Sequence, residues 1–362
     1  MSRSIGIVHR VKTTKAGKAH PTKVCILKGD QSVNYKLETE ENELSWIKEK
    51  HQISKDKLDG LMPGDTIAMI LGGSGDNLAF ALSRQADEIG AKVMRIPPFI
   101  LKEHRNGHLK GDDHILLAQL VKEHEDQFYL ISPRDRDMIL MRECLRHRID
   151  AMKSRISCEQ RVKQREIGKI FTSVDGKFPE GQIEDSFDQA KANNAILNNL
   201  IAEEKSLKKD LNESLERLEI YQKIFKPITG CGPAIASRII SSIIDIKRFN
   251  SKAKLKKFCG VHVDEEGNFP RRRVNQTCNW NPLARQALFL LGDQFNRRPD
   301  SFWGQKLREQ KKKLRLKHPE VILTEKGKKR YNDGHIHKMA IWKTLSKFVE
   351  YVWISWWELE RS

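Results

Sequence analysis

The sequence predicts an α/β domain followed by a longer, entirely helical part. Within residues 1–132, short runs of β-branched and aliphatic residues surround one clearly helical segment. From residue 133 onward, apolar residues recur three or four positions apart over long stretches, which is the spacing of one helix face. We therefore expect three regions, an α/β domain at 1–132, coiled-coil helices at 133–225 and a second helical domain at 226–362.

The composition indicates a polyanionic partner. The chain of 362 residues has a formal net charge of +18 and 31% charged residues. Each phosphate that such a chain neutralises releases counterions and adds sequence-independent affinity, so nucleic acid is the expected partner. We expect no membrane association, because no apolar run reaches the roughly 18 residues of a membrane span and no signal peptide is visible.

The six cysteines are scattered without paired spacing, which is typical of reduced thiols in a cytoplasm. Cys259 and His262, with Cys278 downstream, suggest zinc, but a second close pair of ligands is missing. We therefore expect neither a structural metal nor a disulfide framework.

The α/β domain is predicted from four strand-like segments. Residues 4–9 and 22–27 read as strands joined by a basic loop, and 64–71 and 91–97 read as two more. A helix at 76–89 lies between the last two, and a second helix follows the last strand. This order predicts a three-layer α/β domain that ends near residue 130.

Two long helices follow. One spans about 134–168, and a linker rich in Gly, Pro and Asp at 172–186 separates it from a second helix that reaches residue 225. The pair can close as an antiparallel hairpin within one chain or pair between protomers. The many arginines of the first helix are also compatible with a solvated face.

The stretch at 227–261 carries the strongest functional signal. Gly230 and Gly232 permit a tight turn that exposes backbone N–H groups at the start of a helix at 233–244, which suits a phosphate. Cations crowd the exit of that helix, namely Lys247, Arg248, Lys252, Lys254, Lys256 and Lys257.

More cations follow farther along the chain. We expect nucleic-acid contacts from Arg271, Arg272, Arg273, Arg297, Arg298, Lys311, Lys312, Lys313 and Arg315. The basic segment 304–330 reads as a surface helix and loop that order on an RNA or DNA backbone. The last helix, at 335–359, carries apolar residues at helical spacing and is expected to supply core residues.

The contiguous pattern at 227–261 resembles the C-terminal domain of the bridge-RNA-guided, DEDD-type insertion-sequence transposases. That domain is related to the Nop domain of box C/D ribonucleoproteins and to the Tas proteins of tandem interspaced guide RNA (TIGR) systems. The resemblance implies a RuvC-like, RNase H-type N-terminal domain, a linking coiled coil that dimerises, and a Nop-like C-terminal domain with a helix-hairpin-helix-like element.

In that family, carboxylates on strands hold two Mg²⁺ ions for phosphodiester chemistry. The corresponding positions here are Val8 and Gly72, which cannot ligate a cation, and Asp112 with Asp113. We therefore expect a vestigial nuclease site without catalytic residues and no cofactor, with Mg²⁺ bound only if the site has been rebuilt. Asp76, one turn beyond the missing acid, is the alternative ligand.

The family also places a nucleophilic serine after the Gly-x-Gly helix. No serine lies between Ser251 and Ser301 in this sequence. The resemblance therefore implies an RNA-guided DNA-binding protein of the TIGR-Tas type that does not cut. Its expected partners are a guide RNA, a target DNA and a second copy of itself, in the cytoplasm of a prokaryotic cell or its virus. The alternatives are a recombinase or nuclease with a rearranged metal site, and a scaffold that binds only RNA.

Overall fold

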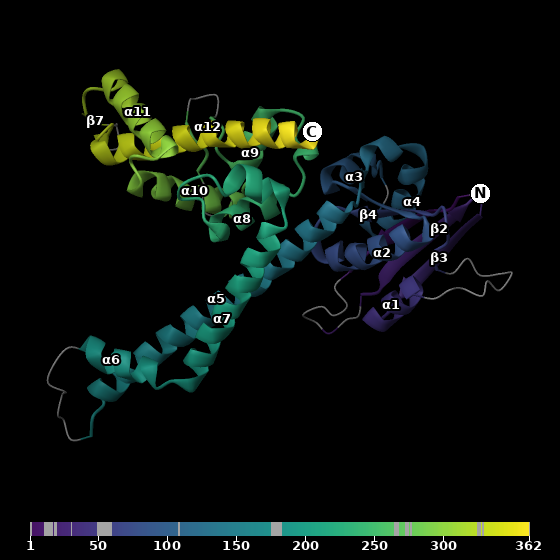
Figure 1. The fold of residues 1–362 in the computed structure, drawn as a ribbon, viewed down its shortest axis with the longest axis horizontal. Helices are drawn as coiled ribbons and strands as arrows, with labels where there is room; N and C mark the ends of the chain where they lie inside the picture. Colours follow the sequence, from purple (N-terminus) through teal and green to yellow (C-terminus); the bar gives the residue numbers. More distant parts are fainter. Residues whose placement is uncertain are drawn as a thin grey trace. The chain divides into compact units, whose positions relative to one another are not determined.

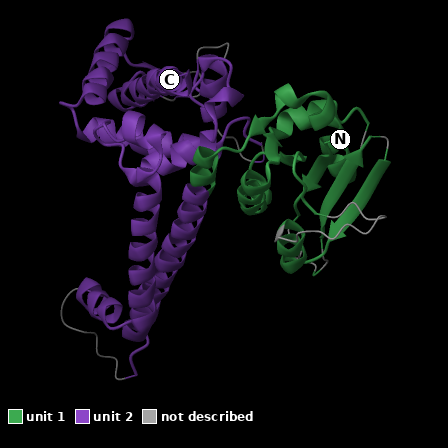
Figure 2. Cartoon of the chain, turned by 45° about the vertical axis from the view of Figure 1, so that its right-hand side comes forward, with its two compact units in different colours: residues 1–139 green, residues 140–362 purple. Residues whose placement is uncertain are grey.

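The computed structural model describes residues 2–10, 17, 20–29, 31–48, 60–107, 109–174, 183–263, 268–271, 275, 277–323, 327 and 329–361. The chain divides into two compact units, residues 1–139 and 140–362 (Figure 2). Within the described ranges, every helix is too short or too polar to cross a membrane.

Unit 1 is built on a six-stranded mixed sheet (Figure 1). Its order is β3-β2-β1-β4-β5-β6, in which β1 runs antiparallel to β2 and parallel to β4, and β4 runs parallel to β5. The strands are β1 (Ser4–Val8), β2 (Thr22–Lys28), β3 (Gln31–Leu37), β4 (Thr66–Ile70), β5 (Lys92–Ile96) and β6 (Tyr129–Leu130).

Helices cover both faces of this sheet. Helices α1 (Glu40–Lys48) and α2 (Asp76–Ile89) share a core with Ile5 and Ile7 of β1. Helices α3 (Pro98–His104) and α4 (Asp113–Glu123) share the opposite core with Val8 of β1. Alternate residues of a strand face opposite sides, so the single strand β1 serves both cores. The three-layer prediction is confirmed for this unit.

One close contact fixes α4 on the sheet. A Cβ atom at Gly6 would lie 2.0 Å from the carbonyl oxygen of His114 and 2.6 Å from the backbone nitrogen of Ala118. Any side chain at position 6 would therefore push α4 away from β1. The small residue in the middle of an apolar strand is explained by this approach of two backbones.

The sequence interpretation of unit 1 missed β3 and α1. The strand β3, QSVNYKL, alternates between exposed and half-buried residues and lies at the sheet edge, so it lacks the apolar run that identified its neighbours. Its pairing with β2, from Thr22 opposite Leu37 to Lys28 opposite Gln31, is set by tertiary contacts. Polar edge strands of this kind are weakly specified by local sequence.

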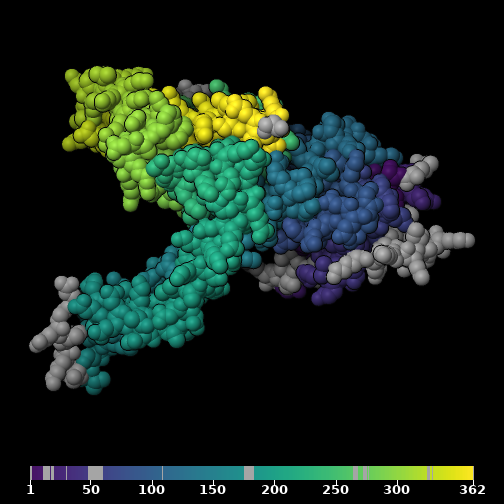
Figure 3. All heavy atoms as spheres, in the orientation of Figure 1, coloured from purple at the N-terminus to yellow at the C-terminus, as the bar shows by residue number. Residues whose placement is uncertain are grey.

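Unit 2 contains a helical hairpin that closes within one chain (Figure 1 and Figure 3). The long helix α5 (Pro133–Phe171), which begins at the end of unit 1, packs against α6 (Ile183–Ala192) and α7 (Ala195–Glu216). Cys158 and Val162 of α5 form a buried cluster with Leu197 of α7. Arg155 bonds Glu204 at 2.6 Å across the hairpin. Of the two expected arrangements, the structure has the intrachain hairpin.

The second helix was expected to run unbroken from the linker to residue 225, and this was wrong. It is interrupted at residues 193–194, where the Asn194 side chain accepts the Leu197 N–H at 2.9 Å and begins a new helix. It changes again at 221–225, which forms a short π-helix. Asparagine favours a helix N-cap over a helix interior, which accounts for the first break.

The remaining helices of unit 2 pack around aromatic residues. Phe348 contacts Phe295 with ring centroids 5.8 Å apart and Trp303 at 5.2 Å. Leu345, Val352 and Trp356 are buried as well, so the prediction that the last helix supplies core residues is confirmed. These elements are α8 (Pro233–Ile243), α9 (Lys252–Cys259), α10 (Pro282–Arg297), α11 (Phe302–Lys317), the two-stranded ribbon β7 (Ile322–Leu323) and β8 (Lys329–Arg330), and α12 (Asp333–Arg361).

Candidate nucleic-acid interface

The Gly-x-Gly turn has two glycines with different structural roles. Gly230 has a φ of +93°, and a Cβ there would lie 3.1 Å from Cβ of Gln294 on α10. Gly232 is the N-cap of α8 with a φ of −69°, and a Cβ there would meet nothing within 4 Å among the described residues. The first glycine is required by the fold, whereas the second leaves the start of α8 uncovered.

A pocket of about 420 Å³ lies in front of this turn. Four parts of unit 2 line it: α5, α7, the turn with the start of α8, and the end of α10. Its cations are Arg148 of α5, Lys208 of α7 and Arg298, which follows α10, and no carboxylate is among its lining residues within the described ranges. The pocket therefore combines an uncovered helix N-terminus with three positive side chains, both of which favour an anion.

The polar groups of the pocket are incompletely satisfied within the described residues. The Nε atom of Arg148 and the Oδ1 atom of Asn212 are buried without a hydrogen-bond partner there. Arg148 has one ion pair, in which its Nη2 lies 3.7 Å from Oε1 of Glu204. Buried polar atoms normally have a partner, so a polar ligand would complete this pocket.

The charge around the pocket is unbalanced. Burial and, to a smaller extent, the positive charge of Arg148 lower the pKa of the Arg238 guanidinium on α8. Both guanidinium groups are half-buried, and Arg238 is not among the residues that line the pocket. An anion bound next to Arg148 would reduce the repulsion between the two arginines.

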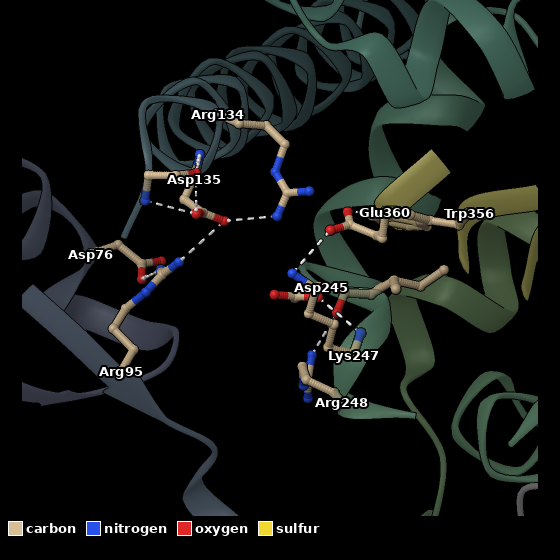
Figure 4. A network of polar contacts seen from close by, with 11 residues as sticks. Asp76, Arg95, Arg134, Asp135, Asp245, Lys247, Arg248, Trp356 and Glu360 are labelled. Atoms are coloured by element: carbon tan, nitrogen blue, oxygen red, sulfur yellow. Dashed lines mark hydrogen bonds and ion pairs between the residues drawn. The ribbon is translucent and has the colours of Figure 1, made fainter. Parts of the chain in front are cut away.

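A strained turn links α8 to the lysine-rich segment. Ile244 has φ +67° and ψ −62°, and the Asp245 N–H donates to the Ile243 carbonyl at 2.8 Å, which defines a γ-turn of the rare hand. Asp245 then accepts the Lys247 N–H at 2.8 Å, and Arg248 donates to the Ile243 carbonyl at 2.7 Å (Figure 4). The turn fixes the direction in which the basic segment leaves the helix.

Several of the expected nucleic-acid contacts are engaged within the protein. The Nζ atom of Lys247 lies 3.2 Å from Oε2 of Glu360 (Figure 4). The Nζ atom of Lys256 lies 2.6 Å from Oε1 of Glu350, so both lysines tie their segment to α12. The guanidinium of Arg248 lies over the rings of Phe249 and Phe258 at 5.3 and 5.4 Å. These side chains stabilise the unit.

The other expected cations divide into three groups. Arg297 pairs with Asp293 at 2.9 Å, Lys311 lies 3.4 Å from Oδ1 of Asn296, and Arg315 bonds Asp333 at 2.5 Å. Arg272 and Arg273 lie outside the described residues. Exposed to solvent are Lys252, Lys254, Lys257, Arg271, Arg298, Lys312 and Lys313.

The vestigial nuclease positions lie in unit 1. Val8 is the buried last residue of β1, and Gly72 follows the adjacent parallel strand β4, so both lie near the carboxyl edge of the sheet. Asp113 begins α4, and its two oxygens accept from Nε and Nη2 of Arg105, each at 2.8 Å. Its side chain is 1% exposed. Asp112, the residue before it, is half-buried.

Asp76 contacts a different arginine on the other face of the sheet. Its Oδ1 lies 3.6 Å from Nη1 of Arg95, and Nη2 of Arg95 lies 3.9 Å from Oδ1 of Asp135 (Figure 4). Arg95 shares a strand face with Val93, whose core contains α2. The core that contains Met94 and Ile96 instead contains α4, which carries Asp113. The two carboxylates therefore begin helices on opposite faces.

Sequence reasoning missed the pocket residues Arg148, Lys208 and Asn212. They lie on α5 and α7, far from the Gly-x-Gly turn in sequence, and only the closure of the hairpin brings them to it. The available signal was the run of arginines in α5, which is equally compatible with a solvated helix face.

Comparison with protein families finds one match. Residues 222–299, which include α8, α9 and α10, match the model of the Transposase IS116/IS110/IS902 family. The match covers less than half of the chain, so it shows a transposase-like segment that includes the turn and part of the pocket. No curated protein matches the chain.

Proposed function

We propose that this protein binds a small guide RNA of the TIGR-Tas kind and recognises DNA through guide pairing, without cutting it. The observation that carries the proposal is the cationic pocket at the Gly-x-Gly turn, a turn that lies in the segment matching the Transposase IS116/IS110/IS902 family. The protein supplies backbone contacts and pairing supplies sequence specificity in such systems. We expect the complex to be a homodimer, which light scattering of the RNA-bound protein would test.

Two features of the pocket support a phosphate ligand. The start of α8 has no side-chain cap, and Pro233 has no N–H to offer. The Ile235 and Ala236 N–H groups both donate to the Gly232 carbonyl at 3.0 Å, so the Ala234 N–H is the backbone donor that remains for a ligand among the described residues of this turn. Lys208 and Arg298 add positive charge from separate elements. Nucleic-acid backbones are recognised mostly by such contacts, which fix position and carry no sequence information.

The absence of cleavage is supported by the state of the remaining carboxylates. Two-metal chemistry needs acidic ligands that converge on two cations about 4 Å apart. Here Asp113 is occupied by Arg105, and Asp76 contacts Arg95 on the opposite face of the sheet. Arg105 neutralises Asp113, and Arg95 lies between Asp76 and Asp135, so a metal at Asp113 or Asp76 would have to displace an arginine.

The test begins with the RNA that copurifies with the full-length protein, which is extracted and sequenced. We expect one size class of small RNA, with retention reduced in a variant that combines Lys208→Ala and Arg298→Ala. The loaded protein is then incubated with guide-matched and mismatched duplexes in Mg²⁺ and in Mn²⁺. Selective retention of the matched duplex without new fragments is the expected result. Guide-dependent cleavage that disappears on Asp112→Ala with Asp113→Ala would contradict the proposal.

The transposase-like segment favours a second candidate, an RNA-guided recombinase. That activity requires a nucleophilic hydroxyl, and no serine lies between Ser251 and Ser301 in this sequence. The two candidates differ in their covalent chemistry. A protein–DNA adduct that survives denaturation, formed on matched DNA, would favour the recombinase.

A further inference from the structure

Three aromatic rings of unit 2 stack on one another where the chain passes from α11 through the β7–β8 ribbon to α12. The centroids of His318 and Tyr331 are 3.9 Å apart with an interplanar angle of 5°. His335 continues the stack from Tyr331 at 5.5 Å and 25°. His318 directly follows α11, Tyr331 follows the β7–β8 ribbon, and His335 lies in the first turn of α12. All three residues are half-buried, so the stack lies at the surface.

The backbone holds Tyr331 in an unfavourable conformation. Its φ of +63° lies in the left-handed region, which is costly for a bulky side chain. The Tyr331 N–H donates to Nδ1 of His335 at 3.0 Å. Arg315 donates to the Tyr331 carbonyl at 3.0 Å and to the His318 carbonyl at 3.3 Å. Hydrogen bonds to the N–H and the carbonyl of Tyr331 therefore maintain its strained backbone, and backbone strain of this kind clusters at functional sites.

Cations surround the stack. The guanidinium of Arg330 lies 5.2 Å from the centre of the Tyr331 ring. Burial, and then Lys317, Lys343 and Arg330, lower the pKa of His318, and burial, Arg330, Arg271, His318 and Lys338 lower that of His335. Neutral imidazoles at neutral pH present flat π faces, while the surrounding side chains retain their positive charge.

We propose that the stack of His318, Tyr331 and His335 is a platform for an unpaired base of a bound nucleic acid, which stacks on the outer face of His318 or of His335 while its phosphates lie against Arg330, Lys317 and Lys343. Any base can stack on an aromatic face, and the flanking cations contact the phosphates of the backbone. Proteins that bind single-stranded nucleic acid combine these two kinds of contact. The platform is separate from the Gly-x-Gly pocket, since none of its three rings lines that pocket. This inference rests on the proposed nucleic-acid binding and adds a second contact point to it.

The experiment compares two fluorescent oligonucleotides of equal length, one with bases and one with abasic sites, in RNA and DNA forms. Each is titrated against the full-length protein after bound RNA has been removed. Tyr331→Asn removes the ring with a residue that tolerates positive φ, and Tyr331→Phe keeps the ring. Tyr331 lies between the two imidazoles and holds them in line, so its loss should disrupt the platform. We expect Tyr331→Asn to weaken binding of the base-bearing strand by about 5- to 150-fold, the range for loss of one stacked base. Tyr331→Phe should bind like the unmutated protein.

The matched control is Phe302→Ala on α11. Phe302 is an exposed ring with a cation over it, Lys306 at 5.6 Å, but it lies about 22 Å from the end of the same helix. Phe302→Ala should therefore bind both oligonucleotides as tightly as the unmutated protein does. The slope of log K against log salt should also be the same for Tyr331→Asn and the unmutated protein, because no phosphate contact is lost.

The outcomes separate this proposal from the proposed function. The platform is overturned if the unmutated protein binds both strands strongly and Tyr331→Asn leaves that binding unaltered. It is also overturned if Tyr331→Asn weakens binding equally with and without bases. Both results leave the proposed backbone binding intact. Failure of the unmutated protein to bind either strand overturns both proposals. A larger effect of Tyr331→Asn on RNA than on DNA assigns the platform to the guide, and the reverse assigns it to the target.

Discussion

The two glycines of the Gly-x-Gly turn should respond in opposite ways to the same substitution. Gly230→Ala places a methyl group at φ +93° and 3.1 Å from Cβ of Gln294. The left-handed conformation alone costs an L-residue about 1–2 kcal/mol. In a unit of this size each kcal/mol lowers the melting temperature by about 2–4 °C, so the unfolding transition of unit 2 should fall by about 2–8 °C.

Gly232→Ala should leave the melting temperature nearly unchanged. Its φ of −69° is ordinary for alanine and nothing described lies within 4 Å of the added methyl. Alanine is a poorer N-cap than glycine by about 0.5–1 kcal/mol, but it reduces the entropy of the unfolded chain by about 0.4–1 kcal/mol, and the two effects nearly cancel. The methyl group nevertheless stands where a phosphate would approach the start of α8. A loss of about 1 kcal/mol corresponds to roughly fivefold weaker RNA binding.

The assay is differential scanning calorimetry of both variants, followed by RNA titration at a temperature where both are folded. The expected pattern is a destabilised Gly230 variant and a Gly232 variant that is stable but binds RNA less tightly. Equal RNA affinity of Gly232→Ala and the unmutated protein would refute the assignment of a phosphate to this turn. An unchanged melting temperature for Gly230→Ala would refute the close packing of the turn against α10.

Three further predictions concern charge. Lys208→Ala combined with Arg298→Ala should reduce the salt slope of single-strand RNA binding by about 1.4, because each phosphate contact contributes about 0.7; an unchanged slope would exclude both from the interface. Arg105→Ala should lower the free energy of unfolding of unit 1 by about 3–5 kcal/mol, since it leaves the buried Asp113 carboxylate without its cation, and adding Asp113→Ala should recover much of the loss in urea melts. The pKa of His335 is held below its ordinary value of 6.5, so the unfolded chain takes up a proton at a higher pH than the folded protein does. The melting temperature should therefore fall as the pH drops from 7 through 6.5. The dependence of the melting temperature on pH should be flatter in His335→Asn.

Local sequence was sufficient to predict a helix or strand wherever the apolar spacing of that element marks one face as buried. Helices α2 and α8 begin at their predicted starts, because their apolar spacing and N-terminal residues are local features. The strands β1 and β2 were recognised from apolar runs, whereas the polar edge strand β3 was missed. The break at Asn194 depended on a single side-chain cap inside a long helical pattern.

The sequence by itself determined that the chain is strongly basic, that an α/β domain precedes a helical part, and that Gly230 and Gly232 open a helix near many cations. Only the tertiary structure decided which cations are available. Lys247 and Lys256 pair with α12, whereas Arg148 and Lys208 reach the turn from the hairpin. Charge is a property of composition, but its partner is set by which elements pack together. For the same reason the stack of His318, Tyr331 and His335 appears only when α11, the ribbon and α12 meet.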